Sequence, residues 1–409
     1  MDCKVEIPSE IDKDVALPLS KSIVARVLII NALTRGADQS ANVPCCDDSE
    51  VLIDALASND DRIDVGAAGT AMRFLTAYFA CQEGRTVTLD GTDRMRHRPI
   101  GPLVDALRQM GASIEYLGNY GYPPLKIEGS KLHGGALTMR GDVSSQFVSA
   151  LLMISPVVGG ITLTLEGEIV SRPYVDMTIS LMRRRGIEVR FGSMGTRLAS
   201  STTIIVPAGH YVPIPINIEG DWSAASYWFA LTALLPQSHI SLSPLHQDSI
   251  QGDSAIVEMM APLGVATRFL EDNKVVLSSD EENLLPAFYE RDMAATPDLV
   301  PTLAVTLCLL RVPFSLTGVA TLRIKESDRL EALREELAKL GYGIDVCDNS
   351  LSYNGNYHEI DGEVTLYSHD DHRLAMALSL GATRHKIVIK NAEVVSKSYP
   401  GWWEQLINA

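Results

Sequence analysis

The sequence predicts an α/β protein of two lobes, each built from three copies of one repeating unit. Two observations predict this fold class: an apolar helix followed by a β-type run recurs six times, and a more polar helix recurs between the copies. With 409 residues, of which 46% are hydrophobic and 21% charged, the chain is long enough for two globular cores. Three prolines within residues 207–221 indicate a connection between the third and fourth copies.

The six apolar segments are rich in Ala and Leu, end at a glycine or a turn, and lead into a β-type run. They begin near residues 20, 68, 144, 221, 298 and 371. Because these helices are apolar nearly all round, we expect them to be buried inside the lobes.

The second helix type has one polar face and passes through a glycine into an alternating strand, as in VDALRQMGASIEY and LREELAKLGYGIDV. Such helices belong on the outside of a lobe. The repeats divide best into an N-terminal lobe of residues 15–218 and a C-terminal lobe of residues 219–409. The run CKVEIP precedes the first repeat, so we assign a strand from residues 1–14 to the C-terminal lobe.

Net charge, apolar stretches and cysteine spacing argue against several classes of protein. A formal net charge of -16 argues against sequence-independent binding of nucleic acid. The start MDCKVEIPSE has no apolar run for a signal peptide, and no stretch is long and apolar enough to cross a bilayer. The six cysteines show no C-x-x-C or His/Cys spacing. We therefore expect a cytoplasmic protein with free thiols, no metal, and neither nucleic-acid nor membrane partners.

One stretch, residues 321–333 (TLRIKESDRLEAL), concentrates charge at a helix start. Ser327 or Asp328 should begin the helix, and three cations lie within seven residues around it. Lys325 and Arg329 are four apart and would share a face. The helix dipole disfavours cations at this end, so something negative should lie against them. The alternative is an ordinary solvated, charged surface.

The N-terminal openings of the six apolar helices are of two kinds. The first three carry no acid; they are Ser20-Lys21-Ser22, Ala68-Gly69-Thr70 and Ser144-Ser145-Gln146. The last three carry Asp221, Asp298 and Asp370-Asp371. Hydroxyls and bare amides suit phosphate, whereas Asp is an ordinary N-cap. If the two halves face each other, anion-binding pockets would oppose carboxylates across a cleft.

Cations accompany these openings, among them Lys21, Arg98, Arg373 and Lys397. Several Arg side chains without a metal-ligand cluster suit two small, multiply charged phosphate or carboxylate compounds. The chain contains no G-x-x-x-x-G-K-[ST], no G-x-S-x-G and no strand-borne G-x-G-x-x-G. P-loop, hydrolase and dinucleotide interpretations therefore lose their main support.

Eight segments spread over residues 17–406 carry a family resemblance: LPLSKSIVAR, AGTAMR, RMRHRPIGPLVDAL, GDVSSQF, SRPYVDMT, RIKESDRL, DDHRLAMALSL and SKSYPGWWEQL. They closely resemble 5-enolpyruvylshikimate-3-phosphate synthase, the enolpyruvyl transferase of the shikimate pathway. The resemblance implies a two-domain, inside-out α/β barrel with three βαβαββ units per domain. It also implies transfer of the enolpyruvyl group of phosphoenolpyruvate to the 5-hydroxyl of shikimate 3-phosphate, through a tetrahedral intermediate and with release of phosphate.

The same resemblance implies roles for single residues. Shikimate 3-phosphate would be bound by Lys21, Ser22, Arg26, Ser144, Ser145, Gln146, Ser171, Tyr174, Asp298 and Lys325. Phosphoenolpyruvate would be bound by Lys21, Gly69, Arg98, Gln146, Arg329, Arg373 and Lys397. Asp298 would accept the proton of the 5-hydroxyl, and Glu326 would move a proton to and from C3, with Lys21 and His372 assisting. The resemblance implies no cofactor, and we expect a monomer.

Four positions depart from the family pattern. Leu19 stands where the family usually has Gly, and Ala25, Ala67 and Thr321 stand where it usually has Asn. These changes affect the fine geometry of both anion sites, and with it the response to glyphosate, which occupies the phosphoenolpyruvate site in this family. Gly69 is retained.

Two alternatives stay open at this point. UDP-N-acetylglucosamine enolpyruvyl transferase shares the fold, but it usually carries a Cys in a loop where this chain has residues 94–99 without one. A non-catalytic, anion-binding scaffold of the same fold is the second alternative. We expect such a scaffold to have lost Asp298, Glu326 or Lys21, and all three are present.

Overall fold

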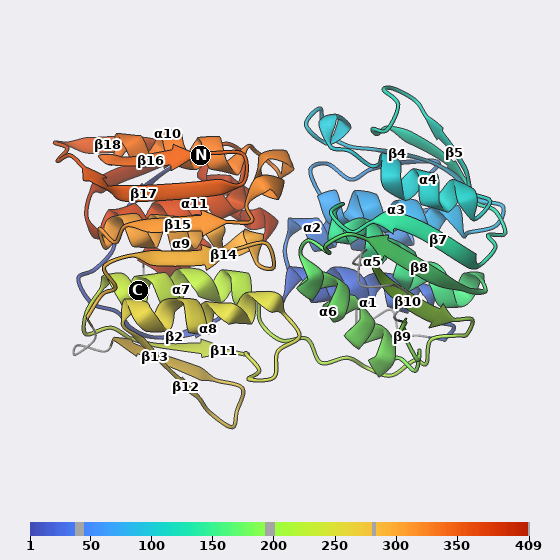
Figure 1. Ribbon diagram of the computed structural model, residues 1–409, viewed down its shortest axis with the longest axis horizontal. Helices are drawn as coiled ribbons and strands as arrows, with labels where there is room; N and C mark the ends of the chain where they lie inside the picture. The colour runs from blue at the N-terminus through green and yellow to red at the C-terminus, as the bar shows by residue number, and fades with distance from the viewer. Residues whose placement is uncertain (37–44, 193–200, 280–283, 408–409) are drawn as a thin grey trace. The chain divides into compact units, whose positions relative to one another are not determined.

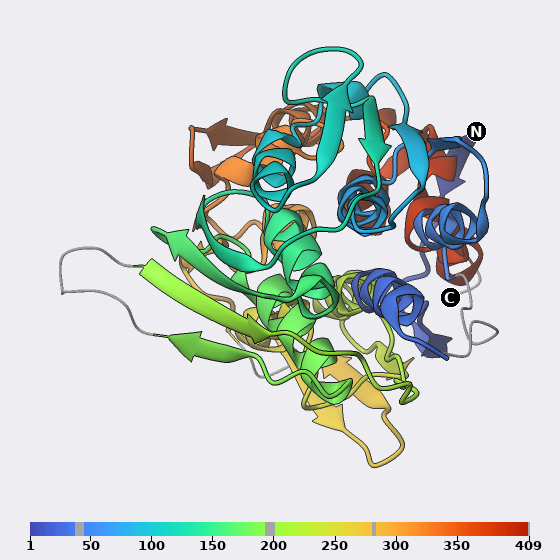
Figure 2. The same cartoon turned by 90° about the vertical axis from the view of Figure 1, so that its right-hand side faces the viewer.

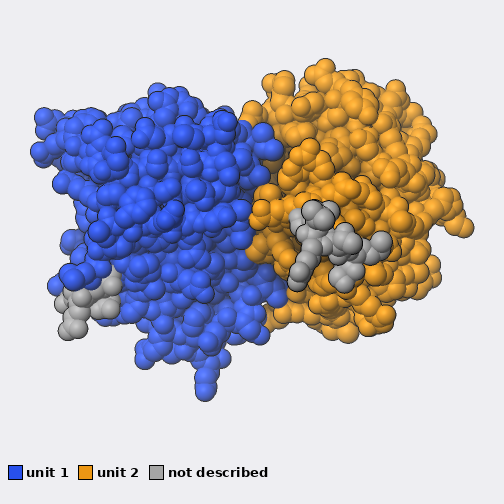
Figure 3. Space-filling view, in the orientation of Figure 1, with its two compact units in different colours: residues 1–20, 219–409 blue, residues 21–218 orange. Residues whose placement is uncertain are grey.

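The computed structural model describes residues 1–36, 45–192, 201–279 and 284–407. The chain forms two compact units, of which unit 1 contains Met1–Ser20 and Glu219–Ala409, and unit 2 contains Lys21–Ile218 (Figure 3). The sequence placed residues 15–20 in the N-terminal lobe, and the structure places them in unit 1. The reason is backbone pairing, because β2 (Asp12–Ala16) pairs with a strand of unit 1 and Ser20 N donates to Glu219 O at 2.9 Å.

Unit 2 follows a regular order of helices and strands (Figure 1). Its elements are α1 (Lys21–Leu33), α2 (Asp47–Ala57), β3 (Arg62–Asp64), α3 (Gly69–Ala80), β4 (Thr86–Asp90), α4 (Gly101–Gln109), β5 (Ser113–Tyr116), β6 (Leu125–Glu128), β7 (Gly135–Arg140), α5 (Ser145–Ile154), β8 (Gly160–Glu166), α6 (Arg172–Arg184), β9 (Arg190–Gly192) and β10 (Ser201–Pro207).

Two βαβαββ repeats are complete in unit 2. Strands β3 to β6 form one sheet in the order β3-β4-β6-β5, and strands β7 to β10 form another in the order β7-β8-β10-β9. In both sheets the first two strands are parallel and the last two pair antiparallel. Figure 2 shows these two sheets on different sides of the helices of unit 2. Of the remaining repeat, the described residues of unit 2 contain the two helices α1 and α2 but no strand of their own sheet.

Unit 1 repeats the same pattern. Its elements after the crossover are α7 (Trp222–Leu234), β11 (His239–Ser243), α8 (Ile256–Met260), β12 (Val265–Phe269), β13 (Val275–Ser279), β14 (Tyr289–Asp292), α9 (Val300–Leu309), β15 (Phe314–Thr317), α10 (Arg329–Lys339), β16 (Tyr342–Val346), β17 (Ser350–Tyr357), β18 (Glu363–Tyr367), α11 (His372–Ser379), β19 (Lys386–Lys390) and α12 (Trp402–Ile407). Strands β14 to β17 form a sheet in the order β14-β15-β17-β16, as in unit 2.

The first residues of the chain complete the other two sheets of unit 1. β2 is the parallel neighbour of β11 in the sheet β12-β13-β11-β2. β1 (Asp2–Val5) pairs antiparallel with β19, which is itself parallel to β18. The βαβαββ unit is therefore present in both units, and the predicted two-domain α/β fold class is confirmed.

The two helix types occupy the positions that their sequences predict. All ten residues of α9 and all eight of α11 are buried, and α7 buries every residue except Ala233. The amphipathic α10 buries only one side, through residues such as Leu330, Leu333 and Leu337. Burial of these inner helices supplies the main hydrophobic stabilisation of each unit. Among the described residues, no helix has the length and apolarity needed to cross a membrane.

Candidate active site

The six inner helices begin in two chemically different ways. In unit 1 Asp221 caps α7 by accepting from Ser223 N at 2.8 Å, and Asp371 caps α11 by accepting from Arg373 N at 3.0 Å. Asp298 lies just before α9, and its carboxylate is turned instead toward cationic side chains. In unit 2, α1, α3 and α5 have no acid in the first turn.

Arg329 is the centre of the charged cluster in unit 1. It is the first residue of α10, its side chain is only 1% exposed, and it contacts three carboxylates. Its Nη1 donates to Asp298 Oδ1 at 3.0 Å, and its Nη2 donates to Glu326 Oε2 at 2.6 Å. Its Nε donates to Asp371 Oδ2 at 2.7 Å. Fully buried charges of this kind are stable only when every charge is paired.

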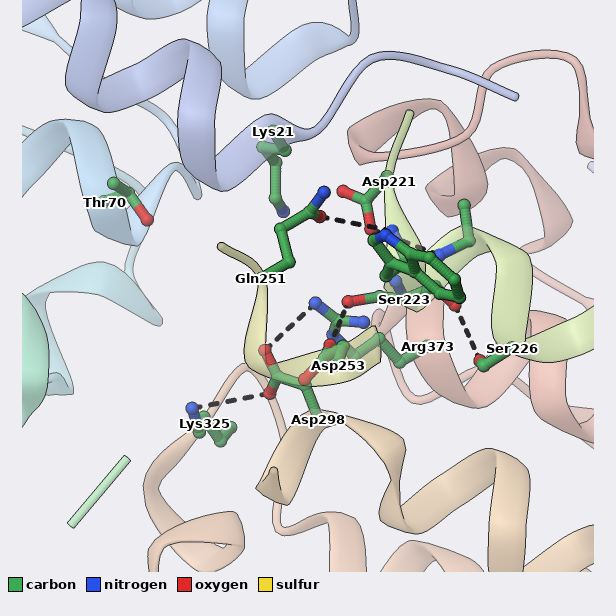
Figure 4. Close-up of polar contacts among 12 residues, drawn as sticks. Lys21, Thr70, Asp221, Ser223, Ser226, Gln251, Asp253, Asp298, Lys325 and Arg373 are labelled. Atoms are coloured by element: carbon green, nitrogen blue, oxygen red, sulfur yellow. Dashed lines mark hydrogen bonds and ion pairs between the residues drawn. The ribbon is translucent and has the colours of Figure 1, made fainter. Parts of the chain in front are cut away.

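Three further cations complete this cluster. Arg373 Nη2 donates to Asp298 Oδ2 at 3.0 Å, and Lys325 Nζ lies 3.5 Å from Asp298 Oδ1 (Figure 4). Lys397 Nζ lies 3.4 Å from Glu326 Oε1. The structure therefore brings together six of the predicted residues, and His372 follows Asp371 directly.

The charges of the cluster hold one another ionised. Burial opposes ionisation of Asp298, but Arg373, Lys325 and Arg329 together hold the pKa of its carboxyl well below the usual range. Burial likewise opposes the charge on Arg329, and the adjacent Asp371, Glu326 and Asp298 raise the pKa of its guanidinium nevertheless. Asp298 is therefore a weak base as long as these cations remain on it.

The helix α10 begins as the sequence predicts. Asp328 is the N-cap and accepts from Glu331 N at 3.2 Å, while Arg323 Nη1 binds the other oxygen of Asp328 at 3.1 Å. The negative partner that the dipole argument requires is supplied by the protein itself, in the form of carboxylates. A bare cationic helix start is thereby avoided.

One group of potential metal ligands lies inside this cluster. Ligand atoms of Glu326, Asp371 and His372 lie within 4.8 Å of one another. Arg329 already donates hydrogen bonds to both carboxylates, so a guanidinium supplies the positive charge that a metal ion would bring. The site is thus built as a network of ion pairs between side chains.

Unit 2 holds the other predicted binding residues. Lys21 Nζ, on the first residue of α1, lies 3.0 Å from Asp48 Oδ2 at the start of α2. The guanidinium of Arg98 lies against Gly69, where an added Cβ would come within 2.7 Å of Arg98 Cζ. Among the described residues, Arg98 Nε has no hydrogen-bond partner. Gly69 therefore allows a cation to approach an open helix N-terminus.

Hydroxyl and amide groups continue this surface of unit 2. Ser144 caps α5, and Gln146 Nε2 donates to Thr70 Oγ1 at 3.0 Å, which links the openings of α5 and α3. Ser171 precedes α6 with a φ of 54°, in the left-handed region that non-glycine residues seldom adopt. These groups offer donors without a fixed negative charge, which is the chemistry that an anion requires.

Arg26 is more deeply placed than its predicted binding role suggests. It is 2% exposed, and its Nε donates to Thr178 Oγ1 at 2.7 Å, while its other nitrogens donate to Ser149 and to backbone oxygens of Ser22 and Tyr174. Burial lowers the pKa of Arg26 to about 10. Arg26 therefore ties α1, α5 and α6 together.

Comparison with known proteins identifies the family. A sequence model described as EPSP synthase (3-phosphoshikimate 1-carboxyvinyltransferase) matches residues 53–406. A 3-phosphoshikimate 1-carboxyvinyltransferase of Bacteroides fragilis is 45% identical over 98% of this chain and 96% of the relative. One from Methanothermobacter thermautotrophicus is 33% identical over 100% of this chain and 98% of the relative.

The chain belongs to the EPSP synthase family. A solved EPSP synthase from Acinetobacter baumannii superimposes with a TM-score of 0.74 over 100% of this chain and 97% of that one, at 20% identity. The enolpyruvyl transferase NikO from Streptomyces tendae gives a TM-score of 0.70 over 99% and 96% of the two chains, at 17% identity. These likenesses show the fold.

Two carboxylates that pair with predicted site residues escaped the site prediction made from sequence. Asp371 was treated only as a helix opening, and the structure shows that it also pairs with Arg329. Asp48, the partner of Lys21, was not singled out at all. An acid in the first turn of α2 reads as an ordinary cap, so only the fold reveals its cationic partner.

The structure shows the surroundings of the four residues that depart from the EPSP synthase family pattern. Leu19 forms an isolated bridge with Gly220, and Ala25 is buried in α1. Thr321 Oγ1 is buried without a hydrogen-bond partner among the described residues. Ala67 is exposed, one residue before the cap of α3. None of the four replaces a charged member of the network.

Proposed function

We propose that the chain is a 3-phosphoshikimate 1-carboxyvinyltransferase, which transfers the enolpyruvyl group of phosphoenolpyruvate to the 5-hydroxyl of shikimate 3-phosphate and releases phosphate. Membership in the EPSP synthase family supports this reaction. The observation that carries it is the cluster of Lys325, Arg329, Arg373 and Lys397 on the carboxylates of Asp298 and Glu326. Such a cluster offers both anion-binding cations and two proton-transfer groups.

In the proposed addition step, the 5-hydroxyl oxygen bonds to C2 of phosphoenolpyruvate while its proton passes to Asp298. C3 gains a proton by way of Glu326, and a tetrahedral intermediate results. In the elimination step C3 returns that proton to Glu326 and the bond from C2 to the phosphate oxygen breaks. The leaving phosphate takes up the proton held by Asp298, which gives the enolpyruvyl ether and phosphate and restores both carboxyl groups. Lys21 and His372 assist these transfers.

The cations connect substrate binding to the basicity of Asp298. Arg373 and Lys325 now pair with Asp298, and Arg329 and Lys397 pair with Glu326. A bound carboxylate or phosphate would attract these same cations. Their positive field at the carboxylates would then be partly neutralised, and the pKa of Asp298 would rise toward a value useful for a base.

We assign the binding groups according to their chemistry. Shikimate 3-phosphate is held by the hydroxyls, amide and cations of unit 2, together with Asp298 and Lys325 from unit 1; the unit 2 residues are Lys21, Ser22, Arg26, Ser144, Ser145, Gln146, Ser171 and Tyr174. Phosphoenolpyruvate is held by Lys21, Gly69, Arg98, Gln146, Arg329, Arg373 and Lys397. Arg26 contributes mainly by fixing the helices that carry the others, since its donors are engaged within unit 2. We further propose a cytoplasmic, monomeric enzyme.

The reaction is tested by mixing the purified protein with shikimate 3-phosphate and phosphoenolpyruvate and measuring released phosphate. Release that requires both compounds supports the proposal. With UDP-N-acetylglucosamine in place of shikimate 3-phosphate, we expect no release. Release in that control alone would point to the other enolpyruvyl transferase, and no release in either mixture would favour a scaffold.

The role of Glu326 has its own test. Glu326→Gln keeps the shape of the side chain but removes the proton-transfer group, so we expect turnover to fall by a factor of about 100 to 10,000. The affinity for shikimate 3-phosphate, measured by calorimetry, should change little. Glu331→Gln is the matched control, because Glu331 lies five residues after Glu326, in the first turn of α10, and pairs with the exposed Arg334. Turnover retained in Glu326→Gln would remove Glu326 from the mechanism.

A further inference from the structure

A second aspartate lies beside the base of unit 1. Asp253, in the short helix Gly252–Ala255, is 3% exposed. Its Oδ2 accepts a hydrogen bond from the hydroxyl of Ser223 on α7 (Figure 4). Its Oδ1 is buried and has no hydrogen-bond partner among the described residues. A buried carboxylate oxygen without a donor is costly when charged, so the site favours a proton there.

The neighbouring backbone keeps Asp253 in this place. Gln251, two residues earlier, accepts from Ser20 Oγ at 2.8 Å and from Trp222 N at 3.2 Å, and it donates to Gly220 O at 2.9 Å. These bonds fasten the segment to the start of α7. The carboxyl of Asp253 therefore cannot turn to solvent without breaking a buried network.

The charged groups around Asp253 come from three elements. Arg373 on α11 favours its ionised form, whereas Asp298 before α9 and Asp221 at the cap of α7 oppose it. On the adjacent α8, the acid Glu258 is exposed and pairs with Arg291. Burial and Asp298 outweigh Arg373, and they raise the pKa of Asp253 to about 7. Two neighbouring aspartates thus differ in protonation near neutral pH, because Asp298 stays ionised.

We propose that Asp253 takes up a proton when phosphoenolpyruvate binds, and that this proton keeps Asp298 ionised as the base. The proposal rests on the proposed function, in which Arg373 binds this substrate. A bound carboxylate or phosphate offsets the positive field of Arg373, which is the group that favours charge on Asp253. Asp253 then becomes protonated in response to the added negative charge, and Asp298 remains ionised. Asp253 does this without touching the substrate. Asp253 is therefore a positioning residue for the protonation state of the site.

The inference predicts a specific pH profile. Between about pH 7 and 9, free enzyme must gain a proton to bind phosphoenolpyruvate, so kcat/KM for this substrate should fall about tenfold per pH unit. The value of kcat should stay level over the same range, because the bound enzyme already carries the proton. The two parameters are measured from released phosphate at saturating shikimate 3-phosphate.

Two variants test whether Asp253 is the group responsible. Asp253→Asn imitates the protonated side chain, so kcat/KM should lose its fall above about pH 7. Ser223→Ala removes the donor that stabilises the charged carboxylate, so the fall should begin at a higher pH. Glu258→Gln, the exposed acid on α8, should keep the wild-type profile. If Asp253 merely supported the fold, its substitution would change activity but not the pH above which kcat/KM falls.

The outcomes separate the inference from the proposed function. The inference would be overturned if wild-type kcat/KM did not fall above about pH 7, or if it fell in the same way in Asp253→Asn. If Asp253→Asn fails to fold, wild-type calorimetry decides: phosphoenolpyruvate is titrated into the enzyme without shikimate 3-phosphate, so that no turnover occurs, at about pH 8 in two buffers of different ionisation heat. Uptake approaching one proton supports the inference, and no uptake overturns it. Absence of phosphate release at every pH would instead contradict the proposed function.

Discussion

The N-termini of the inner helices are surrounded by different chemical groups in the two units. In unit 1 the cations near the N-termini of the inner helices are bound to Asp298, Glu326 and Asp371, and Arg329 is fully enclosed among these carboxylates. In unit 2 the openings hold hydroxyls, amides and Arg98, and only Lys21 has a carboxylate partner at such an opening among the pairs described. One unit is a closed network of charges, and the other is an open surface of donors.

Because of this difference, we expect substitutions in the two units to affect different properties, namely folding stability in one and ligand affinity in the other. A closed network depends on each of its members, because a buried charge without its partner is strongly unfavourable. An open donor surface can lose a member with little effect on folding, since water replaces the missing contact. Substitutions of comparable chemistry should therefore act mainly on folding in unit 1 and mainly on ligand affinity in unit 2.

The largest contrast is expected between two arginines. Arg329→Met would leave three carboxylates without their common partner, and we expect the free energy of unfolding to fall by about 3–5 kcal/mol. Arg98→Met should change it by less than about 0.5 kcal/mol. Urea unfolding of both variants measures the difference. Equal losses would show that the two units do not differ in this respect.

A smaller effect should be confined to binding in unit 2. In Gly69→Ala the new methyl group would lie 2.7 Å from Arg98 Cζ and must displace the guanidinium. We expect KM for phosphoenolpyruvate to rise about tenfold, which corresponds to about 1.4 kcal/mol, with little change in thermal stability. Gly209→Ala is the control, because a Cβ there would lie at an ordinary 3.6 Å from Ile187. A lower melting temperature with unchanged KM would contradict the assignment of an open surface.

The smallest effect distinguishes the caps themselves. Asp221 accepts from two backbone amides of α7, at 2.8 and 3.2 Å, so Asp221→Ala should lower the free energy of unfolding by about 1 kcal/mol. Ser144 accepts from one amide of α5 at 3.4 Å, so Ser144→Ala should lower it by less than about 0.5 kcal/mol. Chemical denaturation of the two variants gives both values. A larger loss in Ser144→Ala would reverse the expected order of the caps.

Local sequence patterns were sufficient to predict the repeats and the helix starts. The apolar periodicity of the inner helices and the glycine after each outer helix are short-range signals, so α9, α10 and α11 appear where predicted. Asp328 could be predicted as a cap because capping depends only on residues within one turn. The family resemblance assigned Lys325, Arg329, Arg373 and Asp298 to the site, but it did not predict that the three cations pair with Asp298.

What the sequence could not supply were the partners that are distant along the chain. Arg329 meets Asp371 across 42 residues, and Lys21 meets Asp48 across 27. Such pairs depend on how the helices pack, and no local pattern encodes that packing. The depth of Arg26 and the enclosed oxygen of Asp253 also depend on neighbours from several elements. The placement of residues 15–20 in unit 1 follows from a strand pairing that only the folded chain reveals.

The strand pairing at the two ends of the chain determines when each unit can be finished during synthesis. Unit 2 is continuous from residue 21 to residue 218, so all of its residues have been synthesised before the second half of the chain is made. Unit 1 must wait, because β1 requires β19 near the end of the chain and β2 requires β11. The first 20 residues therefore remain without their sheet partners while unit 2 folds, and the unit that carries the charged network is completed last.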